Sequence, residues 1–529
     1  MSRPNALLLT LTVLLSSPAA AQTPEAMRAR VEQVHDAPAT PIAGARLLRP
    51  DAVAHFFQAR GFTPAWTGPA PAEILKAIRA IDADGLTPAD YHLAALDSLV
   101  AGKKTAPAED VQLLLTDAVA ALVDEVCYGK VRPRTLDARW NVDPRQDSPP
   151  LDSLVAKVAA SPTASTIEGL KPNHFIYTGL RAALARYREI AARGGWPIIP
   201  AGPAIKPDAP APDKRLAAIR ARLAASGDLA AGDAAGDAYD PALQAAVKTF
   251  QERHRLAADG VIGKTTVDEM NVSAAARADQ IRVNLERVRW VIAGEVDTFL
   301  LVNLPAFKVY AIKDHKNVWE GRTMIGKQAR QTPSFRADLR YVVFNPDWTV
   351  PPTILAKDVL EGMRKGENTI AKKNLTIIDR QGKLVAPDSI DWKTVQARNF
   401  PYTLRQPPGE DNALGRVKFI FPNEHSIFLH DTPHREGFSS DLRTFSSGCI
   451  RLERPLELAA ALLADQPEWT PAKIDTVVAS GKSQTVFLKQ PLPVLLVYWT
   501  VSIGASGDVH FARDVYGRDG PVLRGLAPR

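Results

Sequence analysis

The spacing of apolar residues changes near residue 297, and this change divides the chain into two kinds of structure. From residue 22 to about residue 196, apolar positions recur every three or four residues in segments rich in Ala, Leu and Arg. This spacing predicts amphipathic helices, for example over 72–81, 111–127 and 176–193. After residue 297 apolar and polar positions alternate, which predicts strands. We therefore expect a multidomain α+β protein with a helical first half and a mainly β second half.

The β half is predicted to contain a hairpin, further strands and one long insertion. Strands are expected over 297–312, 318–326, 341–345, 417–421 and 426–430. Residues 351–409 switch to helical and irregular character, so we interpret them as a capping insertion beside the functional site, a candidate lid. We assign residues 297–490 to this domain and 491–529 to a C-terminal extension packed on it.

The helical half is predicted to consist of a scaffold and a smaller module. Residues 22–196 form the helical scaffold, which shows no cluster of catalytic residues, and the proline-rich stretch 197–213 is interpreted as a stiff linker. A small helical module follows over 214–275. Its best helix starts at Asp240-Pro241, an N-cap followed by proline at the first helical position, and places Leu243, Val247 and Phe250 on one face. A connecting helix is expected over 281–292.

The first residues resemble a secretory signal peptide. Arg3 precedes an apolar run over 6–15, and the small residues Ala19-Ala20-Ala21 supply a cleavage site, so 1–21 is predicted to be removed. The apolar run is too short to span a membrane, and no later segment is long enough. We expect an exported, soluble protein, with a retained N-terminal anchor as the alternative.

The formal net charge of +7 favours an anionic partner, or it is ordinary surface charge. Nucleic acid is excluded as a partner because the chain is predicted to be exported and has no run of Lys and Arg. A polyanionic cell wall or membrane surface fits better.

The segment 426–453 contains the residue types that a thiol nucleophile needs. Cys449 is one of only two cysteines in 529 residues, and it lies in a turn with Ser447 and Gly448. His430 ends an apolar run nineteen positions earlier and is our choice of general base. Small residues allow backbone N–H groups to approach a developing oxyanion, so Gly448 and Ser447 are assigned to this turn.

The imidazole also needs an acceptor on its other nitrogen. The Asp431 carboxylate can serve only if the strand has ended there, and a backbone carbonyl near Ser446 or Ser447 is an equal candidate. His434, which follows Pro433 in a loop, is the alternative base. Arg451 lies two residues past Cys449, where it would bind a substrate carboxylate or form a structural ion pair.

Three further readings of these residues stay open. His430, His434 and Cys449 with Asp431 have a ligand spacing for zinc, although that spacing suits a helix and Pro433 interrupts it. Cys449 could form a disulfide with Cys127, which lies in a helical run and looks like a core residue. Cys449 could also be inert and buried.

The β half resembles the L,D-transpeptidases of bacterial cell walls, whose catalytic domain is of the YkuD type. The matching segments are RTMIGKQARQTPSF from Arg322, VVFNPDWTVPPTI from Val342, RQPPGEDNALGRVKFIFPN from Arg405, IFLHDTP, FSSGCIRLE and the tail YWTVSIGASGDVHFARDVYGRD. The segment YDPALQAAVKTFQERHRLAADGVIGKTTVDEM resembles a type 1 peptidoglycan-binding module, with a plain helical linker domain as the alternative. The chain is most similar to the long periplasmic branch of the family.

This resemblance implies a two-step acyl transfer without metal or organic cofactor. Cys449 attacks a tetrapeptide stem, D-Ala leaves, and an amine of a second stem completes a 3→3 cross-link. It also implies periplasmic localisation, the sacculus and its stem peptides as partners, possible contact with other wall synthases, and acylation by carbapenems. Asn412 and His434 join Arg451 as expected substrate contacts. Many members carry Ser-His-Gly-Cys, and Ser447 replaces that histidine here, so its role falls to the backbone or to Ser447.

Other functions remain open on the same residues. With water as acceptor, the site would act as an L,D-carboxypeptidase or cleave 3→3 bridges, and with a protein acceptor it would anchor lipoproteins. A non-catalytic wall-binding scaffold would require loss of Cys449 or His430, and both are present. A papain-like protease is disfavoured because histidine precedes cysteine and the Gly-Cys turn has β context.

Overall fold

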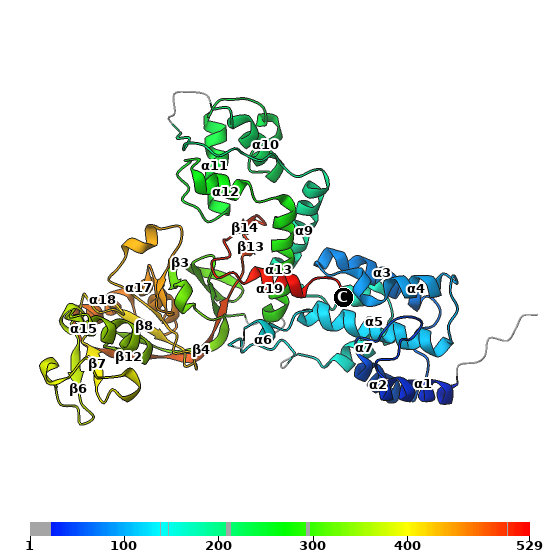
Figure 1. The fold of residues 1–529 in the computed structure, drawn as a ribbon, viewed down its shortest axis with the longest axis horizontal. Helices are drawn as coiled ribbons and strands as arrows, with labels where there is room; N and C mark the ends of the chain where they lie inside the picture. The colour runs from blue at the N-terminus through cyan, green and yellow to red at the C-terminus, as the bar shows by residue number, and fades with distance from the viewer. Residues whose placement is uncertain (1–22, 138, 146–147, 208–212, 293–296, 505) are drawn as a thin grey trace, which may run out of the picture.

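The computed structural model describes residues 23–137, 139–145, 148–207, 213–292, 297–504 and 506–529. The predicted signal peptide therefore lies outside the described residues. Three arms extend from a junction near helix α13 (Figure 1). One arm holds the N-terminal helices, a second holds α10 to α12, and the third holds the β-sheet. The helical first half and the mainly β second half confirm the predicted fold class.

The first arm is built around α5, a helix that is buried on nearly all sides. Its helices are α1 (Pro24–Asp36), α2 (Pro50–Ala59), α3 (Ala70–Ala80), α4 (Leu93–Val100), α5 (Ala108–Tyr128), α6 (Pro133–Leu136), α7 (Leu151–Ala160) and α8 (Ala164–Glu168). Acidic side chains on α5 are buried and paired. Asp117 accepts hydrogen bonds from the main-chain N–H groups of Leu48 and Arg49, at 2.8 and 2.6 Å for the closest contacts. These contacts tie the chain before α2 to the central helix.

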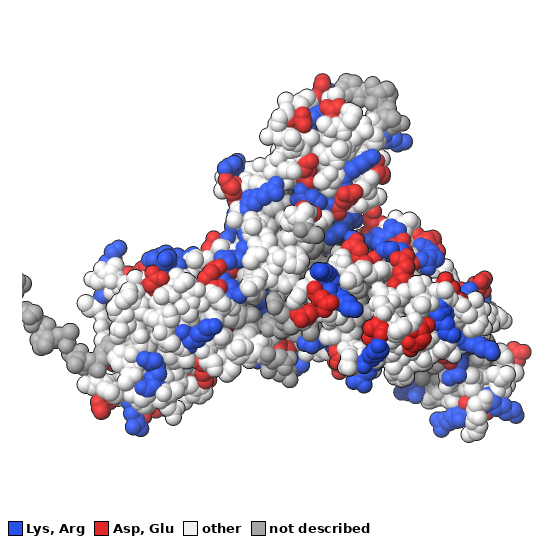
Figure 2. Space-filling model, turned by 180° about the vertical axis from the view of Figure 1, so that it is seen from behind, with Lys and Arg blue, Asp and Glu red and all other residues white. Residues whose placement is uncertain are grey.

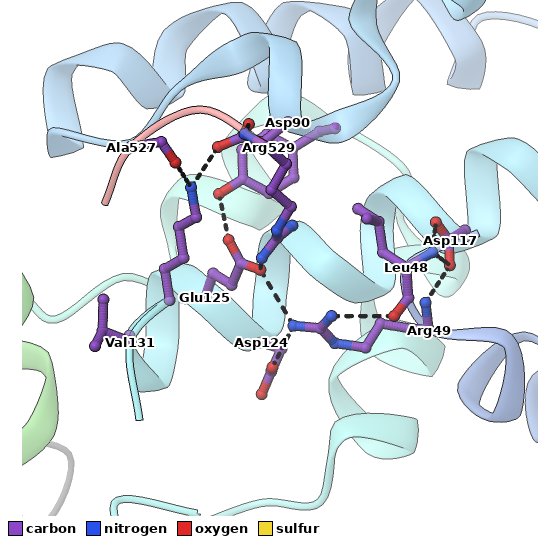
Figure 3. Close-up of polar contacts among 12 residues, drawn as sticks. Leu48, Arg49, Asp90, Asp117, Asp124, Glu125, Val131, Ala527 and Arg529 are labelled. Carbon is purple, nitrogen blue, oxygen red and sulfur yellow. Dashed lines mark hydrogen bonds and ion pairs between the residues drawn. The ribbon is translucent and has the colours of Figure 1, made fainter. Parts of the chain in front are cut away.

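The C-terminal residues return to this arm and bind the same helix (Figure 3). The side chain of Arg529 pairs with Glu125, which also pairs with Arg49 at 3.1 Å. Lys130 donates to Asp90 and to the carbonyl of Ala527, both at 2.7 Å. Because these charges are partnered, their burial does not leave an isolated ion in the core.

The second arm is the small helical module, with its own apolar core. Its helices are α10 (Leu216–Ser226), α11 (Pro241–Arg253) and α12 (Lys264–Met270). The predicted cap is confirmed, because the side chain of Asp240 accepts from the N–H of Leu243 at 2.9 Å. Leu243, Val247 and Phe250 are fully buried, as their spacing predicted.

Helices α9 (Phe175–Ala192) and α13 (Ala274–Ile292) form the junction between the arms. They share an apolar core with the hairpin of β13 (Val501–Ile503) and β14 (Val509–Phe511). Helix α19 (Asp519–Gly525) also packs on α13. The C-terminal segment thus contacts the junction and the first arm, and it packs on the β domain through Tyr498 and Tyr516. The predicted boundary at residue 490 falls inside strand β12.

The third arm is a sheet that closes on itself. Its strands are β1 (Phe299–Asn303), β2 (Lys308–Lys313), β3 (Lys316–Gly326), β4 (Phe335–Phe344), β8 (Val417–Ile420), β9 (Leu429–His430), β10 (Thr444–Ser446), β11 (Ile450–Leu452) and β12 (Gln484–Val497). The strand order is β10-β3-β11-β9-β8-β4-β12-β1-β2, and β2 also pairs with β3, which closes the sheet and leaves the short β10 beside the end of β3. Helices α17 (Pro455–Leu462) and α18 (Pro471–Ala479) pack on its core.

The prediction of one strand over 297–312 is wrong, because that segment is the antiparallel pair β1 and β2. The turn between them is made partly of Leu304 and Phe307, whose side chains are buried in the core. An apolar turn carries no polar signal in the sequence.

The capping insertion lies at the far end of the third arm and has a core of its own (Figure 1). It contains α14 (Pro352–Ile354), α15 (Leu360–Arg364) and α16 (Thr369–Lys372). Its strands β7 (Thr403–Gln406) and β6 (Thr376–Ile378) form a small sheet with β5 (Trp348–Thr349), which lies just before the insertion, in the order β5-β7-β6. A five-residue π-helical turn, Leu355–Val359, joins α14 to α15.

Positive and negative side chains are interspersed over all three arms on the face seen in Figure 2. No arm is covered by one sign of charge on that face. No helix within the described part of the chain has the length and apolar character needed to cross a membrane.

Candidate active site

The turn between β10 and β11 holds Cys449 through hydrogen bonds within the turn and from a neighbouring segment. The Ser446 hydroxyl donates to the carbonyl of Cys449 at 2.5 Å and accepts from the N–H of Gly448 at 3.1 Å. Thr332 donates from Oγ1 to the carbonyl of Gly448 at 2.7 Å. Gly448 has a φ of 126°, a conformation that side-chain-bearing residues rarely adopt. The glycine therefore sets the shape of this turn.

Only some of the N–H groups in this turn are free to bind an oxyanion. The N–H of Gly448 donates to Oγ of Ser446, and the N–H of Ile450 donates to the carbonyl of Phe428, both at 3.1 Å. Among the residues that the structure describes, the N–H groups of Ser447 and Cys449 have no hydrogen-bond partner. The expected role of Gly448 is thus conformational, and the candidate donors are its two neighbours.

His430 ends strand β9, and its ring is buried. Nδ1 lies 2.5 Å from the main-chain carbonyl of Asp431. Because a carbonyl only accepts, Nδ1 must carry the proton and Nε2 is then the acceptor, as a general base requires. The orienting group is therefore neither the carboxylate of Asp431 nor a carbonyl near Ser446. That carboxylate instead accepts from the N–H of Arg416 and pairs with Arg435.

Pairing of two strands places the segments that carry the nucleophile and the base side by side. Strand β11 runs parallel to β9, with Arg451 opposite His430 and Ile450 opposite Leu429. Paired residues share a face of a sheet, and so do residues two apart on one strand. Cys449 lies directly before β11, and the same alternation continued by one residue would place its side chain on the His430 face. Its side chain is half-buried, with Sγ 3.7 Å from the carbonyl of Ser426.

The electrostatic environment keeps both groups neutral at rest. Burial lowers the pKa of His430 to about 3, and the positive charges of Arg451 and Lys418 act in the same direction. Burial raises the pKa of Cys449 to about 11, although Arg451 and the main chain of Phe428 oppose this shift. A resting thiolate–imidazolium pair is not favoured in this environment. The arrangement suits a base that takes the thiol proton as the thiol attacks.

The remaining predicted site residues have different surroundings. Arg451 makes no ion pair with any described residue, its Nε is buried without a hydrogen-bond partner, and the structural ion pair considered above is not formed. His434 is exposed, with Nδ1 3.7 Å from a carboxylate oxygen of Glu436. Ser447 is exposed, and its Oγ accepts from Arg330 at 2.9 Å.

Asn412 is buried, and its amide is used within its own loop. It donates to the carbonyls of Gln406 and Pro407 and accepts from the N–H of Leu414. Its side chain holds the loop before β8 in shape. A contact between Asn412 and substrate stays a prediction.

The structure bears on two alternatives for Cys449, a disulfide with Cys127 and a zinc site. Both cysteines are free thiols, and Cys127 is buried with Sγ 3.3 Å from the carbonyl of Leu170. Within the described ranges, no group of three or more His, Cys, Asp or Glu side chains is arranged to hold a metal ion.

Sequence reasoning assigned no role to Thr332, although it lies in one of the matching segments. Besides supporting Gly448, its Oγ1 accepts from the N–H of Gly326 at 2.9 Å. Tyr516 reaches the same place, where its hydroxyl donates to the carbonyl of Gly326 at 2.5 Å. In the sequence, the pair Thr332-Pro333 does not indicate that the threonine supports the nucleophile turn.

Three parts of the chain match known domain families. Residues 297–478 match the L,D-transpeptidase catalytic domain of the YkuD type. The chain therefore carries an L,D-transpeptidase catalytic domain. Residues 213–270 match a peptidoglycan-binding domain, and residues 51–184 match a scaffold domain.

A Haemophilus influenzae protein assigned as an L,D-transpeptidase is 36% identical over 240 residues, which are 45% of this chain and 48% of that protein. The alignment thus spans about half of the relative. Crystal structures of L,D-transpeptidases from Xylanimonas cellulosilytica and Stackebrandtia nassauensis each align with 56% of this chain. The alignments cover 99% of the first crystallised chain and 97% of the second. Their identities are 15% and 13%, and their TM-scores 0.18 and 0.20.

Proposed function

We propose that this protein is a cysteine-dependent peptidoglycan L,D-transpeptidase that forms 3→3 cross-links. The observation that carries the proposal is the parallel pairing of β9 with β11, which sets the segments of His430 and Cys449 side by side, with Nδ1 of the imidazole held by the carbonyl of Asp431. This arrangement leaves Nε2 as the acceptor, and the thiol on the neighbouring segment lies in a turn with free N–H groups. The match of residues 297–478 to the L,D-transpeptidase domain supports the reaction class.

The first half-reaction forms a thioester. Sγ of Cys449 attacks the carbonyl carbon of the L-centre of meso-diaminopimelate in a tetrapeptide stem, while Nε2 of His430 takes the thiol proton. The N–H groups of Ser447 and Cys449 bind the oxyanion. The bond to D-Ala then breaks, and His430 returns the proton to the leaving amine.

The second half-reaction transfers the acyl group. The side-chain amine of a second stem attacks the thioester, gives its proton to His430 and forms the cross-link, and the thiol is restored. Arg451 is the candidate partner for a carboxylate of the stem, since its guanidinium is half-buried and has no acid partner among the described residues. With water or a protein amine as acceptor, the same site would perform hydrolysis or lipoprotein anchoring.

The other parts of the chain support action at the wall. The match of residues 213–270 favours the sacculus as partner, and the proposed signal peptide over 1–21 favours the periplasm. We propose the organisation set out from the sequence, with the scaffold over 22–196, the module over 214–275 and the cap over 351–409.

The test is the intact mass of the mature protein after incubation with a carbapenem and, separately, with tetrapeptide-containing muropeptides. One adduct that is absent from Cys449→Ala, together with dimeric products that have lost D-Ala, is the expected result. An adduct with only tripeptide products would replace cross-linking by hydrolysis. Absence of both adduct and product would refute the proposal.

A further inference from the structure

The side chain of Arg330 connects the nucleophile turn to the capping insertion. Its NH1 donates to Oγ of Ser447 and to Oδ2 of Asp358, both at 2.9 Å. Its NH2 donates to Oδ1 of Asp358 at 2.8 Å. Ser447 lies two residues before Cys449, and Asp358 belongs to the cap. One guanidinium therefore contacts both the nucleophile turn and the capping insertion.

The main chain of Arg330 is held in place, so its side chain has a fixed origin. Arg330 ends the short helical turn Gln328–Arg330 after β3, and its N–H donates to the carbonyl of Lys327 at 2.8 Å. Its carbonyl lies against Gly326, where an added Cβ would come within 2.1 Å of the oxygen. This close approach requires glycine at 326 and seats Arg330 on the end of a strand.

The cap presents Asp358 on a π-helical turn. Leu355 and Val359 of the turn are buried in the core of the cap, whereas the Asp358 side chain is one-third exposed and meets Arg330. π-Helical turns are rare and occur frequently at functional sites. Here the turn anchors its apolar residues in the cap and directs one carboxylate toward the catalytic domain.

The contact has the geometry of a strong ion pair. Two parallel hydrogen bonds join the planar guanidinium to the carboxylate, and the Arg330 side chain is only 12% exposed. The hydrogen bonds from Arg330 lower the pKa of Asp358, and Lys327 and Lys373 act in the same direction. The carboxylate is therefore charged at neutral pH.

We propose that Arg330 is a positioning residue that orients Ser447 in the nucleophile turn and, through Asp358, holds the cap over Cys449. The Ser447 contact keeps the N–H of that residue directed for the oxyanion. The Asp358 contact limits the access of water to the thioester, so that an amine acceptor is preferred. The effect on product choice rests on the proposed function, whereas the effect on access to the thiol does not.

The test separates the two contacts with single substitutions. Asp358→Asn keeps the shape of the side chain and removes its charge, and Ser447→Ala removes only the contact to the turn. Asp347→Asn is the matched control, because Asp347 pairs with Arg405 at 3.1 Å within the insertion and its immediate flank. Access is measured as the rate of Cys449 alkylation by a bulky maleimide divided by the rate with iodoacetamide, with Cys449→Ala as the blank.

We expect Asp358→Asn to raise this ratio by about three- to tenfold, the range for losing a partly shielded charged contact. The same variant should increase hydrolysis relative to cross-linking, while acylation changes little. Ser447→Ala should slow acylation without changing the alkylation ratio. The exchange Arg330→Asp with Asp358→Arg should restore the alkylation ratio and leave acylation slow.

An unchanged alkylation ratio in Asp358→Asn, or an equal change in Asp347→Asn, would overturn the proposal. A changed ratio in an enzyme that forms no cross-links would support the cap contact and refute the transpeptidase instead. A ratio that changes while product partition stays constant would overturn the role of the cap in excluding water.

Discussion

At the junction of the arms, the guanidinium of Arg289 is fully buried and meets Glu286 at 2.8 Å, the hydroxyl of Tyr177 and a carbonyl. In the catalytic sheet, the half-buried guanidinium of Arg451 has no acid partner among the described residues, and its Nε has no hydrogen-bond partner. Arg289 is fully buried and compensated by partners in the protein, whereas the buried Nε of Arg451 has none.

The difference separates the frame from the site. Paired charges around α5 and α13 join segments that are distant in the sequence, including the C-terminal residues, and favour one arrangement of the arms. In the sheet, Nε2 of the buried His430 ring and the half-buried thiol of Cys449 have no charged partner among the described residues. Groups in that condition are available to a ligand or to a reaction. Substitutions in the paired charges of the junction and in the unpartnered groups of the candidate site test this difference.

Cys449→Ala should have the largest effect. Turnover should fall by at least about 10⁴-fold, because the attacking thiol is lost and the other cysteine, Cys127, is buried in the scaffold. Steady-state cross-linking of muropeptides measures the loss. Cys127→Ala is the control, because Cys127 is buried in the scaffold and should leave turnover unchanged. Turnover by Cys449→Ala above background would remove this residue from the mechanism.

His430→Ala should lower the rate of acylation by about 10²- to 10⁴-fold, the range for loss of a positioned general base. His434→Ala should have a much smaller effect, because that ring is exposed in a loop. Single-turnover acylation by a carbapenem compares the two variants directly. A greater loss in His434→Ala would identify that residue as the base.

Loss of the Arg289 side chain should affect stability. Arg289→Met leaves Glu286 buried and unpaired, which costs about 3–5 kcal/mol of the free energy of local unfolding. Hydrogen–deuterium exchange along α13 measures this quantity for the junction alone. Lys264→Met is the control, because its pair with Asp268 is exposed, and it should stay within about 0.5 kcal/mol. Equal protection of α13 in both variants would mean that the buried pair does not stabilise the junction.

Local sequence patterns predicted the helical arms better than the sheet. Helix spacing indicated α3, α5 and α9 to within a few residues, and the Asp240-Pro241 pair marked the start of α11. The hairpin turn between β1 and β2 was missed because its residues are buried. Of the predicted strand 426–430, only Leu429 and His430 are in the sheet. Strand limits depend on partners that lie far away in the chain.

For the candidate site, the sequence supplied residue types but not their neighbours. Cys449 and His430 were proposed from chemistry, whereas the parallel pairing of β9 with β11 is a non-local contact. Asn412 was expected to meet substrate, but a loop that bends back on itself uses its amide. Arg330 and Asp358 are 28 positions apart in different parts of the fold, so no spacing rule could join them.

Arg451→Met should have the smallest effect of this set, and it tests whether an unpaired arginine tunes the reacting pair. The positive charge of Arg451 lowers the pKa values of both His430 and Cys449. Its removal should therefore raise both pKa values, and the pH profile of Cys449 alkylation by iodoacetamide should move to higher pH. KM for stem peptides should rise by about tenfold if the guanidinium binds a carboxylate.

The same profile in the unsubstituted protein distinguishes a neutral pair from a resting ion pair. With the pKa of Cys449 raised to about 11, the alkylation rate should climb through the alkaline range and approach its limit only near that value. A thiolate stabilised by imidazolium would instead give a plateau from mildly acidic pH upward. Arg454→Met is the matched control, because Arg454 pairs with Glu457 at 2.7 Å and should leave the profile in place. A plateau at neutral pH would show that the reacting pair is charged at rest, and the contrast between paired charges in the frame and neutral groups in the site would fail.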